Sequence, residues 1–119
     1  MSHDSSVAVA AVALRRDYAS LGIDIEPAEV LPAEALDLVA TPYEQARIAH
    51  DPYCGRLLFA AKEAVYKAIF PLDQIFLEPH DVEVDLAQQR ASVRNGRTVN
   101  LQFCTSAHLL AVAFLPGNA

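Results

Sequence analysis

The sequence has 119 residues, 53% of them hydrophobic and 20% charged, which excludes a disordered chain and predicts one domain spanning residues 1–119. Its formal net charge of −6 argues against nucleic acid as a partner, because neutralising nucleic-acid phosphates needs a basic surface. No apolar run reaches the length of a membrane span, no secretory signal is evident, and Cys54 and Cys104 lack metal-ligand spacing, so a reduced cytoplasmic protein without a membrane partner is expected.

The first elements of the chain are predicted to be β-strands. Val7–Leu14 is an apolar run that fits either a buried strand or a short buried helix, and its valines together with the charged break at residues 15–17 favour a strand of a hairpin. Leu21–Glu26 alternates apolar residues with polar or small ones, which is the two-residue period of a half-buried strand. One face carries the apolar residues Leu21, Ile23 and Ile25. The other face carries Gly22, Asp24 and Glu26.

Two short helices are predicted next from their start signals. Pro32 opens a helix over Ala33–Ala40. The tetrapeptide Thr41-Pro42-Tyr43-Glu44 is a capping box with proline at the first helical position. It predicts a second helix over Pro42–Ala49.

A third, longer helix has the strongest periodic pattern in the chain. Asp51, ahead of Pro52, is expected as its N-cap, and the helix is predicted to run to about Ile69. Pro71 lacks an N–H and disfavours helical geometry at the residue before it, so the helix should stop at Phe70. Its apolar residues recur at three- and four-residue spacing and form one stripe: Leu57, Ala61, Ala64, Val65 and Ala68.

The remainder of the chain is predicted to be a loop over residues 71–80 followed by β-strands. Asn95-Gly96 is a strong hairpin signal, and Val99, Leu101 and Phe103 should face the core. Because the helices and the strands are segregated along the chain, an α+β domain is expected, with an antiparallel sheet packed on one long and two short helices. The predicted strands are Val82–Leu86, Ala91–Arg94, Arg97–Cys104 and Leu109–Leu115.

Four residues are candidates for chemistry. Asp24 and Glu26 lie two apart on a strand, so both carboxylates leave the same face. Glu63 and Lys67 lie one turn apart on a helix expected to pack nearby, so their charged groups can converge on a common ligand. Three convergent carboxylates suit Mg²⁺, which takes oxygen ligands and is commonly shared with a substrate phosphate. The alternative is structural: a solvated strand face, a helix ion pair worth about 0.2–0.5 kcal/mol, and no site.

Two segments of the sequence resemble a known pair of motifs. Gly22-Ile23-Asp24-Ile25-Glu26 and the later Phe59–Lys67 resemble the motifs of the 4'-phosphopantetheinyl transferases, and are most like those of the surfactin- and enterobactin-type enzymes. The family patterns read G-I/V-D-I/V-E and W/F-S/C/T-x-K-E-A/S-x-x-K. The two motifs in this order and spacing are specific, whereas either motif alone is weak. Ser2-His3, ahead of the first predicted strand, also resembles a Ser-His pair of the family.

The resemblance implies an enzyme of the holo-carrier-protein synthase type. Such enzymes move 4'-phosphopantetheine from coenzyme A to a serine of an acyl, peptidyl or aryl carrier protein, with Mg²⁺, and release adenosine 3',5'-bisphosphate. It implies Asp24, Glu26 and Glu63 as ligands of Mg²⁺ on the pyrophosphate of coenzyme A. Glu63 is also the implied base for the serine hydroxyl, directly or through water.

The resemblance also implies three residues for phosphate. Lys67 would bind phosphate, and Lys62 would help it. His3 would contact a phosphate of coenzyme A, although a histidine three residues from the N-terminus also fits a frayed terminus.

Two departures from the family pattern bear on function. Ala60 stands where the pattern has Ser, Cys or Thr. The surfactin-type enzymes have two similar halves with the active site between them, and this chain resembles only the second half. An active chain is therefore expected to form a homodimer or homotrimer, because the face between the halves is apolar and would otherwise be bare. The alternative is a non-catalytic half-domain that binds coenzyme A or metal, or that needs a partner subunit.

Overall fold

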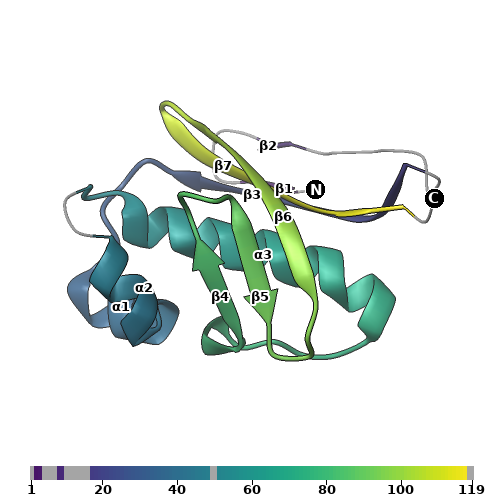
Figure 1. The fold of residues 1–119 in the computed structure, drawn as a ribbon. Coiled ribbons are helices and arrows are strands. Elements are labelled where there is room, and N and C mark those ends of the chain that lie inside the picture. Colours follow the sequence, from purple (N-terminus) through teal and green to yellow (C-terminus); the bar gives the residue numbers. More distant parts are fainter. Residues whose placement is uncertain (1, 4–7, 10–16, 49–50, 118–119) are drawn as a thin grey trace.

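Helices cover one face of a five-stranded antiparallel sheet in the computed structural model, which describes residues 2–3, 8–9, 17–48 and 51–117 (Figure 1). The strand order is β3-β7-β6-β5-β4, and a separate antiparallel pair, β1-β2, lies beside β3. This arrangement confirms the predicted α+β class, with one long and two short helices. The elements in chain order are β1 Ser2–His3, β2 Ala8–Val9, β3 Tyr18–Pro27, α1 Ala33–Val39, α2 Pro42–Arg47, α3 Cys54–Asp73, the 3-10 turn η1 Pro79–Asp81, β4 Val82–Asp85, β5 Arg90–Val93, β6 Thr98–Thr105 and β7 His108–Pro116.

The edge strand β3 turns its polar side toward α3 and not toward solvent. The Ser20 hydroxyl donates a hydrogen bond of 2.6 Å to the Ala68 carbonyl oxygen of α3. The predicted strand over Leu21–Glu26 is confirmed, but it is not half-buried, because all four residues Gly22–Ile25 are buried. Ile23 and Ile25 lie on the face of the sheet opposite α3. The solvated-face interpretation therefore fails for Asp24, which is 7% exposed.

The two short helices begin where the sequence signals predict. Pro32 immediately precedes α1 as its N-cap residue. In α2, the Thr41 hydroxyl oxygen accepts from the Glu44 N–H at 3.2 Å, and the Glu44 carboxylate accepts from the Thr41 N–H at 2.8 Å. This reciprocal pair is the predicted capping box. The helix is shorter than predicted and ends at Arg47.

The limits of α3 differ from the prediction at both ends. The Asp51 carboxylate accepts from the Tyr53 N–H at 2.8 Å and closes a turn, so the N-cap residue is Tyr53 and not Asp51. Pro71 does not stop the helix, because it removes only one N–H in the last turn and the chain continues to Asp73. The helix ends at Gln74, which adopts left-handed geometry with φ of 54° and donates its N–H to the Phe70 carbonyl oxygen at 3.0 Å.

Hairpins connect β4 to β7 as predicted, with limits shifted by a few residues. The Asn95-Gly96 turn joins β5 to β6, and Gly96 has φ of +94°. Val99 and Leu101 are buried, and Phe103 is half-buried against the core. The predicted loop over residues 71–80 is wrong at both ends, because residues 71–73 belong to α3 and η1 begins at Pro79.

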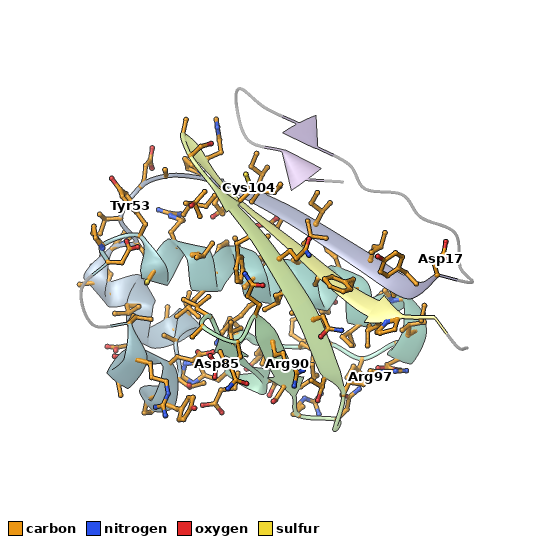
Figure 2. The ribbon with its side chains drawn as sticks, turned by 45° about the horizontal axis from the view of Figure 1, so that its top comes forward. Asp17, Tyr53, Asp85, Arg90, Arg97 and Cys104 are labelled. Carbon is orange, nitrogen blue, oxygen red and sulfur yellow. The ribbon has the colours of Figure 1, made fainter. Side chains whose placement is uncertain are left out.

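Figure 2 labels one residue near each end of α3: Tyr53 at the N-terminal end and Arg97 near the C-terminal end. Arg97 pairs there with Asp73, with Nε–Oδ2 and Nη2–Oδ1 distances of 2.6 and 2.8 Å. Of the predicted strand Val7–Leu14, Ala8–Val9 forms β2 and pairs with β1, and the remainder lies outside the described residues. No helix in the described ranges has the length and apolar character needed to cross a membrane.

Candidate functional site

The contact between β3 and α3 brings the two candidate segments together. Gly22 makes this contact possible, because a Cβ added to it would lie 1.9 Å from the Ala64 carbonyl oxygen and 2.7 Å from the Ala68 backbone nitrogen. Real Cβ atoms do not approach backbone atoms that closely, so only glycine permits this distance between strand and helix. The strand residues on the same face as Gly22 are thereby held against α3.

Lys67 of α3 binds directly to this face of β3. Its ammonium donates to the Asp24 carboxylate and to the Ile23 carbonyl oxygen, each at 3.1 Å. The Asp24 side chain is 10% exposed, whereas the Lys67 side chain is 35% exposed. One side of this ion pair is thus buried and the other side reaches solvent.

Arg56 makes a second link, nearer the N-terminal end of α3. Its Nη1 lies 3.4 Å from Oε1 of Glu26, and both side chains are 19% exposed. The sequence interpretation did not include Arg56 in the site. Its spacing from Glu63, two helical turns earlier, places both residues on the α3 face that adjoins β3 and would have indicated this position.

The carboxylates at this contact affect one another. Burial raises the pKa of Glu63 above its usual value of 4.5, the charge of Asp24 raises it further, and Lys67 opposes both effects. Burial and then Asp24 also raise the pKa of Glu26, while the hydrogen bond from Arg56 lowers it and the charge of Glu63 raises it slightly. Asp24, Glu26 and Glu63 therefore form one electrostatic cluster in which added positive charge is favourable.

The donor set of this cluster fits a hard divalent cation, because carboxylate oxygens are the ligands that Mg²⁺ prefers. Their geometry is more open than a formed metal site. Over the described parts of the chain, no three His, Cys, Asp or Glu side chains converge closely enough to hold a metal ion. The position beside Asp24 is taken by the Lys67 ammonium.

Lys62 does not join the cluster. Its ammonium is buried and donates to the Val39 carbonyl oxygen at 2.6 Å, to the Glu44 carboxylate at 2.6 Å and to the Pro79 carbonyl oxygen at 2.9 Å. Burial lowers the pKa of Lys62, and the hydrogen bond that it donates to Glu44 counteracts this effect. The three donors of the ammonium are therefore used within the fold, so Lys62 offers none to a phosphate in this arrangement.

The surroundings of Glu63 include two aromatic residues of the Phe59–Lys67 segment. Phe59 and Tyr66 line a shallow pocket of about 20 Å³ together with Glu63 and Lys62. Ala60, which departs from the family pattern, is fully buried, so a side chain without a polar group suits its position. The backbone of His3 lies in β1, and its side chain lies outside what the structure describes.

Comparison with known proteins identifies relatives of this chain. The family model of the 4'-phosphopantetheinyl transferase superfamily matches residues 20–113. The 4'-phosphopantetheinyl transferase Svp of Streptomyces mobaraensis is 41% identical over 90 residues, which are 71% of this chain and 37% of Svp. The 4'-phosphopantetheinyl transferase PptT of Mycobacterium tuberculosis is 38% identical over 88 residues, 71% of this chain and 39% of PptT.

A third relative extends the match further along the chain. The 4'-phosphopantetheinyl transferase Npt of Nocardia iowensis is 34% identical over 99 residues, 81% of this chain and 45% of Npt. The chain thus spans less than half the length of each of these three relatives. The matched region contains α3 and all of β3 except its first two residues, and these two elements form the carboxylate cluster. The chain belongs to the 4'-phosphopantetheinyl transferase superfamily.

Proposed function

We propose that this chain carries the metal- and phosphate-binding side of an enzyme that transfers 4'-phosphopantetheine from coenzyme A to a carrier-protein serine. The observation that supports it is the contact between β3 and α3, where Asp24 and Glu26 of one motif face Glu63 and Lys67 of the other. The acceptor is an acyl or peptidyl carrier protein, as the resemblance implies. The placement within the surfactin- and enterobactin-type branch stays a prediction.

In the proposed site, Asp24, Glu26 and Glu63 hold Mg²⁺ through their carboxylate oxygens. When bound, the ion neutralises charge on the pyrophosphate of coenzyme A. The partly exposed Lys67 side chain is positioned to contact a phosphate oxygen through its ammonium. Phosphoryl transfer depends mainly on positioning and charge stabilisation, and this set of residues supplies both.

Glu63 is the proposed base for the serine hydroxyl. It takes the proton of the hydroxyl, directly or through one water, as the serine oxygen bonds to the phosphorus that carries pantetheine. The bond from that phosphorus to the adenosine bisphosphate breaks, and adenosine 3',5'-bisphosphate leaves. A carboxylate that reaches the hydroxyl, directly or through one water, meets the geometric requirement for a general base.

The proposed enzyme needs a second protein surface to complete the site. The chain spans less than half the length of its relatives, and the Lys67 side chain beside the carboxylate cluster is 35% exposed. We expect a second copy of the chain to supply this surface in a homodimer or homotrimer. His3 remains the proposed contact to a coenzyme A phosphate.

A labelling reaction tests the proposed function. The chain is incubated with fluorescent coenzyme A, Mg²⁺ and a panel of carrier proteins, and transfer of label to the carrier is expected. Glu63→Ala should abolish the transfer, while Glu34→Gln, which changes an exposed carboxylate in the first turn of α1, should leave it unchanged. Transfer that survives Glu63→Ala would contradict the catalytic assignment.

A non-catalytic half-domain is the second candidate function. The open arrangement of the carboxylates in the described residues favours it, because a complete transferase site needs converged ligands. It predicts that the chain binds coenzyme A or Mg²⁺ but labels no carrier protein unless a separate subunit is added. Labelling by the chain alone would exclude this candidate.

A further inference from the structure

A buried ion pair lies on the side of α3 away from β3. The Lys62 ammonium and the Glu44 carboxylate are 2.6 Å apart, and their side chains are 3% and 0% exposed. The same ammonium also donates to the Val39 and Pro79 carbonyl oxygens. One atom of α3 is therefore bonded to three other segments: the end of α1, helix α2 and the 3-10 turn η1.

The Glu44 carboxylate extends this network to the sheet. Its Oε1 accepts from the Thr41 N–H as well as from Lys62, and its Oε2 accepts from the Val84 N–H of β4. Each polar group of the pair thus has defined partners in rigid elements. Because hydrogen bonds weaken steeply with misalignment, such a network fixes direction as well as distance.

The packing contacts of α3 fix its orientation less strictly. The buried residues on the core side are mostly small and apolar, including Ala61, Ala64 and Ala68. Apolar contacts are non-directional, so by themselves they hold the helix against the sheet without specifying its rotation about its own axis. Hydrogen bonds of Ser20 and Lys67 add direction on the β3 side of the helix. The Lys62–Glu44 pair adds it on the opposite side.

Lys62 immediately precedes Glu63, so the constraint acts at the edge of the carboxylate cluster. Consecutive residues of a helix are about 100° apart around its axis, and a helical backbone does not let one turn independently of the next. With Lys62 held between α1, α2 and η1, Glu63 and Lys67 are directed toward Asp24 on β3.

We propose that Lys62 and Glu44 are positioning residues, which set the rotation of α3 so that Glu63 and Lys67 meet the carboxylates of β3. This role rests on the proposed metal-binding function of the cluster. It replaces a direct contact of Lys62 with phosphate. The pair touches neither metal nor substrate and acts only through the helix.

The test separates positioning from stability by removing both charges together. Lys62→Met alone leaves the Glu44 charge buried without its partner and should lower the melting temperature. The double variant Glu44→Gln/Lys62→Met keeps the side-chain volumes and leaves no unpaired charge, so its melting temperature should return toward the wild-type value. Mn²⁺ affinity, measured by calorimetry as a stand-in for Mg²⁺, should stay about tenfold below wild type in the double variant.

A matched control covers the case in which the double variant remains unstable. Val65→Ala removes fully buried apolar volume from α3 without touching the pair, so it lowers stability by loss of packing alone. The proposal requires weaker Mn²⁺ binding in the double variant than in Val65→Ala at temperatures where both are folded to the same extent.

Two results would overturn the proposal. A double variant that binds Mn²⁺ as tightly as wild type, or no more weakly than Val65→Ala, shows that the pair serves stability only. A wild-type chain that does not bind Mn²⁺ counts against the proposed function itself and removes the basis of the positioning role. The two failures are distinguished by whether the wild-type titration succeeds.

Discussion

Gly22 sets the distance between the two motif-bearing elements at the scale of a single residue. Its backbone lies against the carbonyl of Ala64 and the amide of Ala68, both of which are small residues of α3. A family motif that begins with glycine is thus explained by packing as much as by chemistry. Asp24 and Glu26 reach α3 because Gly22 has no side chain to hold the strand away from the helix.

Gly22→Ala should destabilise the protein. The new methyl group meets backbone atoms, which cannot move aside as a flexible side chain can, so β3 or α3 must shift at a cost of about 1–3 kcal/mol. Urea unfolding measures this change. Gly55→Ala is the matched control, because its methyl group would meet only side-chain atoms at 3.2–3.4 Å and should cost less. Equal losses in the two variants would contradict the role of Gly22.

Glu63 should make the stability of the metal-free protein depend on pH. Its folded pKa is raised above 4.5, so the folded state holds the proton more tightly than the unfolded state. Protonated Glu63 contributes its full stabilisation at pH values below its pKa in the unfolded state. This stabilisation is lost as the pH rises through its pKa in the folded state. Glu63→Gln should therefore stabilise the protein at neutral pH, with the gain vanishing on the acid side of 4.5.

Urea unfolding midpoints of wild type and Glu63→Gln, measured from neutral to acid pH, test the predicted sign of this stability difference. A gain that grows toward acid pH would contradict the raised pKa of Glu63. Glu34→Gln, at an exposed position, is the control for the change from carboxylate to amide.

The C-terminal end of α3 shows, at the scale of an element, where sequence rules apply and where they fail. Pro71 and the residue before it have non-helical preferences, yet both are helical, because the missing N–H of Pro71 costs only one backbone hydrogen bond and the helix ends two residues later. The actual end is the left-handed Gln74, whose side-chain amide also donates to the Phe70 carbonyl oxygen at 3.2 Å. No pattern in the sequence marks glutamine for that conformation.

Gln74→Gly should raise the free energy of unfolding by up to about 1 kcal/mol, since glycine adopts the left-handed conformation without strain. Loss of the side-chain bond to Phe70 reduces this gain. Chemical denaturation measures it, and Gln102→Gly, at an exposed extended position of β6, should instead destabilise. A loss of stability in both variants would show that Gln74 is not strained.

Sequence signals predicted the elements well where the structure depends only on neighbouring residues. The capping box of α2, the Asn95-Gly96 turn and the strand over Leu21–Glu26 depend on neighbours in sequence and are confirmed. The face that β3 turns toward α3 and the burial of Lys62 depend on distant segments. Periodicity shows that a strand has two faces but not which one meets a helix, and a lysine in a motif does not reveal a buried partner such as Glu44.

The whole molecule holds its carboxylate cluster at the contact between an edge strand and a helix, where Lys67 reaches solvent, and we expect a second surface to meet the cluster there. If a second copy supplies it, analytical ultracentrifugation should give a mass of at least two chains. Coenzyme A together with Mg²⁺ should strengthen the association, because binding to the assembled state favours that state. A mass of one chain under all these conditions would contradict self-assembly and favour a separate partner subunit.

The proposed function requires that carboxylates of β3 and α3 hold a divalent cation on the pyrophosphate of coenzyme A. Calorimetric titration of the chain with coenzyme A, with and without Mg²⁺, tests it most directly. We predict binding with Mg²⁺ that is lost without the ion and weakened at least about tenfold by Asp24→Asn. Binding that is equal with and without Mg²⁺, and equal in wild type and Asp24→Asn, would contradict the claim.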